Sequence, residues 1–223
     1  MIDLFCGYDK REAVGFHTFC ASVMERASQT VSIHPLAAMG LPEGSNNFTI
    51  SRFLVAYLMG FRGRAIFADA CDMLMLADVA ELDALFDPKY AVQVVKHGDY
   101  TSQHERKYVG TEMECDQSNY SRKNWASVML VNCAHSAWFA MTPKMISMAE
   151  PIDLLQFKFF EDKEIGALPP EWNVLIDEGH ERQGAKLLHW TAGIPTFKHY
   201  RNARASKDWF AEFESMTGAM QHG

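Results

Sequence analysis

Short apolar runs alternate along the chain with segments whose apolar residues recur at helical spacing. Residues 2–6 form an apolar run that stops at Gly7, and residues 11–26 then carry apolar side chains every three to four positions. The alternation recurs further along the chain, where residues 48–60 have helical spacing and residues 64–68 form the next apolar run. A buried parallel strand is a nearly continuous apolar run, and a covering helix has one apolar face. This alternation therefore predicts an α/β domain with a mainly parallel sheet flanked by helices.

The same signals predict further strands and helices along the rest of the chain. The strands are expected at residues 31–36, 91–95, 126–131 and 186–189, and the helices at residues 78–86 and from residue 203 onward. Residues 97–124 are polar and irregular, which leaves both a binding loop and a missed element open. Residues 142–185 carry mixed helix and loop signals. We therefore expect one domain over residues 1–200, followed by a helical tail over residues 201–223.

Two acidic residues follow the apolar strand predicted at residues 64–68. Ligands collect at the carboxyl ends of the strands in such a sheet, so Asp69 and Asp72 would point into the cleft there. Carboxylate oxygens suit hard cations such as Mn²⁺ or Mg²⁺, which keep open positions for phosphate oxygens. The same two residues are equally compatible with turn or helix-capping acids on a solvated loop.

His189 ends another apolar run and precedes a loop that contains glycine and proline. An imidazole at this place could be the third ligand of the same metal. A histidine after an apolar run is more often a hydrogen-bonded core residue, so this assignment depends on the two acids. Lys96 and His97 follow the strand predicted at residues 91–95, where they would either touch a ligand or form a surface pair.

The polar loop at residues 97–124 interleaves basic and aromatic side chains. These residues are Lys107, Tyr108, Tyr120, Arg122 and Lys123. Their arrangement fits an acceptor-binding loop and a solvated surface loop equally well.

The composition is that of an ordinary globular protein, and its charge argues against a nucleic-acid partner. The 223 residues include 21 Lys and Arg against 28 Asp and Glu, a formal net charge of −7, without a long basic run. The five cysteines contain no Cys-x-x-Cys pair, which predicts a cytoplasmic location. No run of about 18 apolar residues occurs, so no membrane span is expected. Trp209, Phe210 and Phe213 could pack on their own domain or lie on a membrane surface.

Several motifs in order resemble bacterial glycosyltransferases related to family 8, the group that includes glycogenin and the lipooligosaccharide galactosyltransferases. The resemblance covers residues 2–200 and begins with Cys6-Gly7-Tyr8-Asp9 after the first strand. It continues with Thr49-Ile50-Ser51-Arg52-Phe53, Asp69-Ala70-Cys71-Asp72 and His189-Trp190-Thr191-Ala192-Gly193. It implies a single Rossmann-like GT-A domain that transfers a sugar from a nucleotide-diphosphate sugar, with UDP as the expected nucleotide.

The resemblance also implies roles for individual residues. Asp69, Asp72 and His189 would hold Mn²⁺ or Mg²⁺, while Gly7, Tyr8, Asp9, Arg52 and Gly193 would bind the nucleotide. Lys96, His97 and Trp125 would contact the substrates, and Asn124, Glu161 and Asp162 are the catalytic candidates beside the transferred sugar. The resemblance implies transfer with retention of anomeric configuration. The acceptor would be a glycan, a lipid-linked group or a protein.

Two departures from the family pattern leave other functions open. The acidic motif is one residue longer than Asp-x-Asp, and Ile194 precedes Pro195 where the family often carries a lysine for the diphosphate. Lys198 and Arg201 are nearby cations that could replace it. The alternative is therefore a degenerate member that binds a nucleotide sugar or an acceptor without turnover. A sugar-nucleotide pyrophosphorylase is less favoured, because few glycines follow the first strand.

Overall fold

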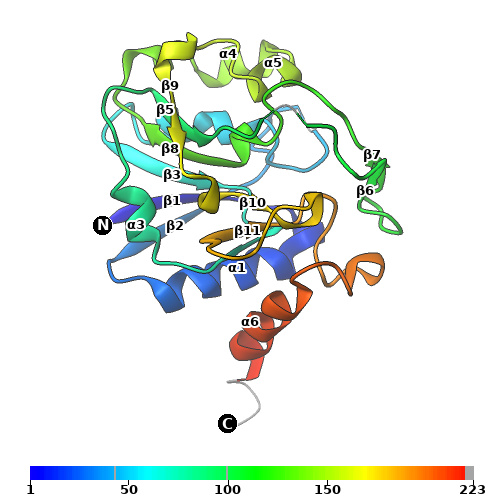
Figure 1. Cartoon of the computed structure of the whole chain (residues 1–223). Coiled ribbons are helices and arrows are strands. Elements are labelled where there is room, and N and C mark those ends of the chain that lie inside the picture. The colour runs from blue at the N-terminus through cyan, green and yellow to red at the C-terminus, as the bar shows by residue number, and fades with distance from the viewer. Residues whose placement is uncertain (43, 99, 219–223) are drawn as a thin grey trace.

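A six-stranded sheet in the order β2-β1-β3-β8-β5-β9 forms the centre of the molecule (Figure 1). The computed structural model describes residues 1–42, 44–98 and 100–218. The strands are β1 (Ile2–Gly7), β2 (Val31–Leu36), β3 (Arg64–Ala68), β5 (Val92–Val95), β8 (Val128–Asn132) and β9 (Ile165–Leu168). Adjacent strands are parallel except around β8, which is antiparallel to β3 and β5. The predicted α/β class with a mainly parallel sheet is confirmed.

A smaller sheet in the order β10-β11-β4 continues from the end of β3. Its strands are β4 (Met73–Met75), β10 (Val174–Leu175) and β11 (Leu187–His189). Strand β11 pairs antiparallel with β4 and parallel with β10. A separate two-stranded ribbon, β6 (Arg106–Lys107) with β7 (Cys115–Asp116), projects from the long polar loop (Figure 1).

Helices cover the sheets and connect their strands. They are α1 (Ala13–Arg26), α2 (Val55–Leu58), α3 (Val79–Asp83), α4 (Pro143–Met148), α5 (Pro151–Leu155) and α6 (Ser206–Gly218). The Asp78 carboxylate accepts from Ala80 N at the start of α3, and Thr142 caps α4 ahead of Pro143. Helix α1 packs against β4 and against α6. Helices α1 and α6 are neighbours in the lower half of Figure 1.

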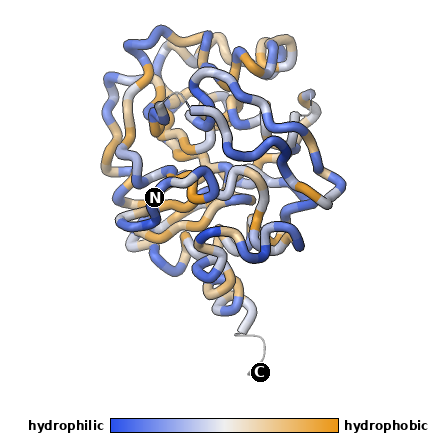
Figure 2. The backbone as a smooth tube through the Cα atoms, turned by 45° about the vertical axis from the view of Figure 1, so that its right-hand side comes forward, coloured by the Kyte–Doolittle hydropathy of each residue, from blue (hydrophilic) through white to orange (hydrophobic). Residues whose placement is uncertain are grey.

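The apolar side chains of the strands form the core, and the hydrophilic segments lie mainly on the outer loops (Figure 2). A second apolar cluster joins α6 to the smaller sheet, where Trp209 is fully buried with Leu74 and Trp190. Phe210 and Phe213 are partly buried beside it. This aromatic stripe of α6 therefore packs on its own domain. Among the described residues, no helix combines the length and the apolar content that crossing a bilayer requires.

The sequence-based prediction was wrong at several strands, and it did not foresee β4 at Met73–Met75. Strand β8 begins at Val128, because residues 125–127 form a turn of 3-10 helix where a strand was expected from residue 126. Strands β9 and β10 lie in residues 142–185, which had been assigned to helix and loop. Both strands are short, and β9 includes a glycine, so neither gives a clear period-2 pattern.

Candidate metal centre

The four-residue acidic motif is a tight turn that carries the chain from β3 into β4. Ala70 adopts the left-handed conformation at φ 52°, and Met73 N donates to the Ala70 carbonyl at 3.2 Å. The turn places Asp69 just after β3 of the central sheet and Asp72 just before β4 of the smaller sheet. The extra residue is thus absorbed by the left-handed turn, and both carboxylates can reach the same point.

Strand pairing brings His189 to these acids from the other end of the chain. His189 is the last residue of β11 and lies opposite Met73 in the antiparallel pair with β4. Trp190 N donates to the Asp72 carbonyl at 2.9 Å, which continues the ladder by one residue. The imidazole is therefore fixed beside the turn by backbone hydrogen bonds.

The three side chains form a compact group that fits a divalent metal. One ligand atom from each of Asp69, Asp72 and His189 can be chosen so that all lie within 4.8 Å of one another. All three residues are buried, with exposed fractions of 7%, 3% and 2%. The Oδ1 atoms of Asp69 and Asp72 have no hydrogen-bond partner among the described residues. Buried oxygens without partners are costly, and a bound cation would satisfy them. Neither acid caps a helix.

Two polar neighbours hold the ligands in place. Arg52 Nη1 lies 2.7 Å from Asp69 Oδ1 in an ion pair and also donates to the Ala126 carbonyl at 2.9 Å. The guanidinium therefore neutralises Asp69 and fixes its position. His189 Nδ1 lies 2.9 Å from Asn173 Oδ1, and its Nε2 lies 3.5 Å from Asp72 Oδ1.

Burial and mutual charge set the protonation of the group. Burial, reinforced by the charge of Asp72, raises the pKa of Asp69 to about 6, although Arg52 opposes the shift. Burial also disfavours the charged form of Asp72, but the charges of His189, Lys107 and Arg52 outweigh it and lower the pKa of Asp72. Burial disfavours the imidazolium of His189, and the adjacent carboxylates outweigh it and raise the pKa of His189. Metal binding would displace any proton held by these ligands.

A polar cavity of about 60 Å³ opens over the three ligands. Among the predicted site residues, those that line it are Arg52, Asp69, Asp72, Asn124 and His189. Asn124 reaches it because β8 runs antiparallel to β3, with Val128 opposite Ala68, so the chain before β8 meets the end of β3. A neighbouring hollow of about 260 Å³ shares Thr49, Tyr120 and Asn124 with this cavity.

Residues 7–9 lie at the end of β1 as expected, but not in the lining of this cavity. The Asp9 carboxylate is fully buried and accepts hydrogen bonds from Arg11 and from Asn47 N. Tyr8 packs edge-on against Phe16 with 5.1 Å between ring centroids. Gly7 lies against Phe48, whose ring would be 2.4 Å from a Cβ at position 7.

Gly193 is also outside the lining of the cavity. A Cβ added at this position would lie 2.5 Å from the Tyr200 ring, so the missing side chain allows the closing segment to pack on that ring. Its place in the structure is explained by packing.

Lys96, His97 and Trp125 form one cluster at the end of β5, apart from the cavity lining. Lys96 Nζ donates to the Ile165 carbonyl at 2.7 Å and lies 5.5 Å from the centre of the Trp125 ring. Trp125 Nε1 donates to the His97 carbonyl at 3.1 Å. In the structure these side chains contact one another and neighbouring parts of the protein.

Of the three catalytic candidates, the structure brings Asn124 to the metal ligands and leaves the two acids elsewhere. Asn124 lines the cavity and donates from Nδ2 to the Tyr100 hydroxyl. Glu161 and Asp162 are exposed at the surface, where they form ion pairs with Lys163 and Arg122.

Several residues of the site were not assigned to it from the sequence. Lys107 and Tyr120 of the polar loop line the cavity, and Asn173 supports His189 from behind. Glu12 is buried next to this group, with both carboxylate oxygens lacking hydrogen-bond partners among the described residues. Burial, with the charge of Asp72, raises its pKa well above the usual value. Lys107 and Tyr120 had been placed in the polar loop at residues 97–124, whose role the sequence left open.

Solved structures with the same fold are glycosyltransferases. WbbM, a bifunctional glycosyltransferase, matches 99% of this chain with a TM-score of 0.65 at 12% identity, and this chain spans 50% of its length. GlyE of Streptococcus pneumoniae matches 99% with a TM-score of 0.63 at 11% identity, and 63% of its length is spanned. The galactosyltransferase LgtC, solved with donor and acceptor sugar analogues, matches 98% with a TM-score of 0.59 at 13% identity over 96% of its length. These likenesses establish the GT-A glycosyltransferase fold.

A curated plant protein is similar in sequence to most of the chain. No family profile matches. Protein CDI of Arabidopsis thaliana is 35% identical over 229 residues, an alignment that covers 95% of this chain and 85% of that protein. On this similarity and on its GT-A fold, the chain belongs to the same family as Protein CDI.

Proposed function

We propose that the chain is a metal-dependent glycosyltransferase that moves a sugar from a nucleotide-diphosphate sugar, with UDP as the nucleotide, to an acceptor. The observation that carries this proposal is the convergence of Asp69, Asp72 and His189 on one point under a polar cavity. A hard cation held by two carboxylates and one imidazole keeps coordination positions for phosphate oxygens. The GT-A fold of the structural neighbours is consistent with this chemistry.

The residues present fit Mn²⁺ or Mg²⁺. Asp69 and Asp72 would each offer an unpartnered oxygen, and His189 would offer Nε2 because its Nδ1 faces Asn173. When bound, such a metal stabilises the negative charge that grows on a diphosphate leaving group. Arg52 neutralises Asp69 and holds the start of the acidic turn in position.

Asn124 is the side chain that we place beside the transferred sugar. It lines the cavity with the metal ligands, and its left-handed backbone at φ 61° directs the chain into β8. We keep retention of anomeric configuration as part of the proposal. The catalytic roles of Glu161 and Asp162 remain predictions from the resemblance. Nucleotide binding by residues 7–9 remains a prediction as well. The acceptor would be a glycan, a lipid-linked group or a protein, and the five free cysteines fit a reducing cytoplasm.

Ligand-dependent stabilisation is the first test. A ligand that binds the native state raises the melting temperature by mass action, so UDP and UDP-sugars should do so when Mn²⁺ is present. Asp72→Asn should abolish the metal-dependent part of this shift. Asp153→Asn, at a half-exposed acid on α5, is the matched control and should behave as the wild type. Equal shifts in both variants would remove Asp72 from the site.

Turnover separates the proposal from its alternatives. Release of UDP from a UDP-sugar in the presence of Mn²⁺ is expected for a transferase. Stabilisation by UDP-sugars without such release, across a panel of donors and acceptors, would instead identify a binding protein. Consumption of a nucleoside triphosphate and a sugar phosphate would identify a pyrophosphorylase.

The left-handed turn at Ala70 removes one reason for expecting a degenerate site. The longer acidic motif still delivers both carboxylates to a common point, with ligand atoms within 4.8 Å. The other reason is the missing lysine before Pro195, so the proposed activity depends on which side chains balance the charge of the diphosphate.

A further inference from the structure

Lys107 brings to the cavity of the metal ligands a positive charge that has no carboxylate partner among the described residues and lies 5.1 Å from the centre of the Tyr108 ring. Among the described residues, two basic side chains line this cavity, Arg52 and Lys107. Arg52 is committed to Asp69 and to the Thr49 and Ala126 carbonyls. Within residues 1–42, 44–98 and 100–218, no carboxylate oxygen lies within 4.0 Å of Lys107 Nζ. Most arginines of the protein, in contrast, form an ion pair with a carboxylate. A half-buried lysine without a counter-ion is suited to bind an anion.

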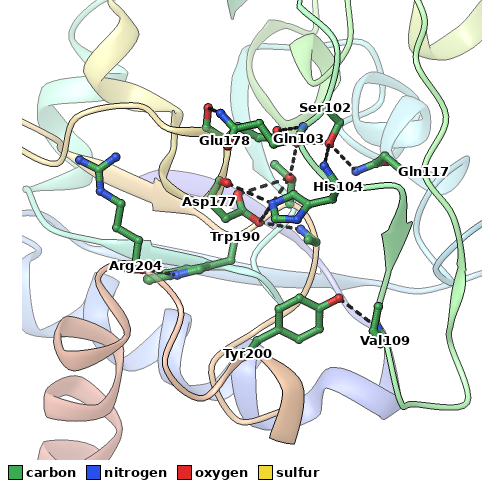
Figure 3. A network of polar contacts seen from close by, with 12 residues as sticks. Ser102, Gln103, His104, Val109, Gln117, Asp177, Glu178, Trp190, Tyr200 and Arg204 are labelled. Carbon is green, nitrogen blue, oxygen red and sulfur yellow. Dashed lines mark hydrogen bonds and ion pairs between the residues drawn. The ribbon is translucent and has the colours of Figure 1, made fainter.

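A strap made of residues 100–117, which includes β6 and β7, carries Lys107. Figure 3 shows the polar contacts that hold this strap at Ser102, Gln103 and Gln117. At its beginning, Ser102 Oγ and Gln103 N donate to the buried Glu178 carboxylate at 2.5 and 2.8 Å. Gln117 Nε2, at its other end, donates back to Ser102 Oγ at 3.3 Å. The strap is therefore closed on itself and tied to the segment after β10.

The strap is held again immediately after Lys107. Tyr108 N donates to the Ala192 carbonyl at 2.7 Å, and Val109 N donates to the Tyr200 hydroxyl at 3.0 Å. Asp177 accepts from Ala192 N at 2.8 Å, so the segment that receives the strap is fixed as well (Figure 3). Lys107 is thus anchored on both sides, and its neighbour Tyr108 bonds to Ala192, three residues after His189.

The charges around the cavity explain what this lysine could bind. The carboxylates of Asp69 and Asp72 are balanced by Arg52 and Lys107, so a divalent cation would leave an excess of positive charge. A diphosphate supplies the matching negative charge, whereas a neutral sugar doesn't. Lys198 and Arg201 of the closing segment are exposed and do not line the cavity.

We propose that Lys107 contacts the diphosphate of the nucleotide-sugar donor and stabilises it as a leaving group. This inference rests on the proposed function. The strap gives Lys107 the position, and the absence of a counter-ion among the described residues leaves its ammonium free to donate to phosphate oxygens.

The proposal can be tested by measuring UDP binding and Mn²⁺ binding separately, because removal of the Lys107 charge should weaken the first and should not weaken the second. Calorimetry would follow Mn²⁺ alone, and then UDP in saturating Mn²⁺, for the wild type and for Lys107→Gln. Removal of the positive charge should weaken UDP binding by about tenfold, since a charge-assisted hydrogen bond is lost. The same removal should leave Mn²⁺ binding unchanged or tighter, because one repulsive charge near the cation is gone. Lys107→Arg, which keeps the charge, should recover most of the UDP affinity.

Control variants separate the proposal from a structural role of the lysine. Lys198→Gln and the exposed Lys144→Gln remove the same charge elsewhere and should bind UDP as the wild type does. Loss of both Mn²⁺ and UDP binding in Lys107→Gln would assign Lys107 to holding the strap and would overturn the proposal. Wild-type UDP affinity in Lys107→Gln would overturn it too. Absence of Mn²⁺-dependent UDP binding in the wild type would instead refute the proposed function itself.

Discussion

Asn173 Oδ1 lies 2.9 Å from His189 Nδ1 and thereby determines which ring nitrogen faces the acidic turn. The Asn173 amide is itself oriented, because its Nδ2 donates to the Asn124 carbonyl at 3.1 Å. The oxygen must then accept a hydrogen bond from the Nδ1–H group, which leaves Nε2 on the side of Asp72 at 3.5 Å. Asn173 thus sets the direction of the His189 imidazole, which is one of the three candidate metal ligands.

Asn173→Ala should therefore weaken metal binding without removing a ligand. Loss of the partner frees the ring to rotate and to change tautomer, and such changes typically reduce metal affinity by about 10- to 100-fold. Calorimetric titration with Mn²⁺ measures the effect. Asn132→Ala is the control, because Asn132 is also buried but bonds to the Pro88 carbonyl at the opposite end of β8. Similar Mn²⁺ affinities in both variants would show that Asn173 does not orient the imidazole.

The Arg52–Asp69 pair should be important for stability. Both side chains are almost completely buried, and removal of one partner leaves the other charge uncompensated. Arg52→Met is expected to lower the free energy of unfolding by about 3–5 kcal/mol, measured by urea denaturation without metal. Asp69→Asn in the Arg52→Met background should recover part of this loss.

Arg64→Met provides the matched comparison for that prediction. Arg64 pairs with Asp83, but its side chain is 43% exposed. A surface pair of this kind contributes about 0–1 kcal/mol. Equal losses for Arg52→Met and Arg64→Met would mean that the buried pair has no special role.

The sequence predicted best those parts of the fold that have continuous apolar signals. Strands β1 and β3 and helix α1 were located from apolar runs and helical spacing, because each is buried along its length or on one face. Strands β4 and β10 have two or three residues and acquire their structure by pairing with β11. No local pattern specifies such pairing.

The site shows the same division between local and long-range information. Asp69, Asp72 and His189 could be named as candidates because the two acids follow β3 within four residues and His189 ends β11. Asp9 has the same sequence context, yet its carboxylate is taken by Arg11 and Asn47, contacts that hydropathy cannot reveal. Lys107 was left open, because its place depends on bonds from the strap to residues about 75 to 90 positions away, such as Glu178 and Tyr200.

Gly15 of α1 should be essential for the acidic turn. A Cβ at this position would lie 1.9 Å from the Cys71 carbonyl oxygen, and a backbone atom cannot move aside as a flexible side chain can. Gly15→Ala should therefore displace the turn and lower both the melting temperature and the Mn²⁺ affinity. Gly98→Ala, where a Cβ meets nothing within 4 Å, should change neither. Wild-type Mn²⁺ binding in Gly15→Ala would show that the turn tolerates this contact.

His97 should make the protein less stable in mild acid. Burial, together with the charges of His180 and His189, lowers the pKa of His97 to about 3, whereas an unperturbed histidine has a pKa near 6.5. Between these values the unfolded chain binds a proton that the folded chain does not, so stability falls as the pH falls through this window. The fall is at most about 1.4 kcal/mol per pH unit.

The contribution of His97 can be isolated by comparing urea denaturation at pH 7 and pH 5. His97→Gln removes the titrating group, so its loss of stability over this interval should be smaller than that of the wild type by about 1–2 kcal/mol. His17→Gln, on the exposed side of α1, should lose as much stability as the wild type. The lowered pKa of His180 acts in the same direction, which is why a smaller loss and not its disappearance is expected. An unchanged pH dependence in His97→Gln would mean that this imidazole becomes protonated in the folded protein without cost.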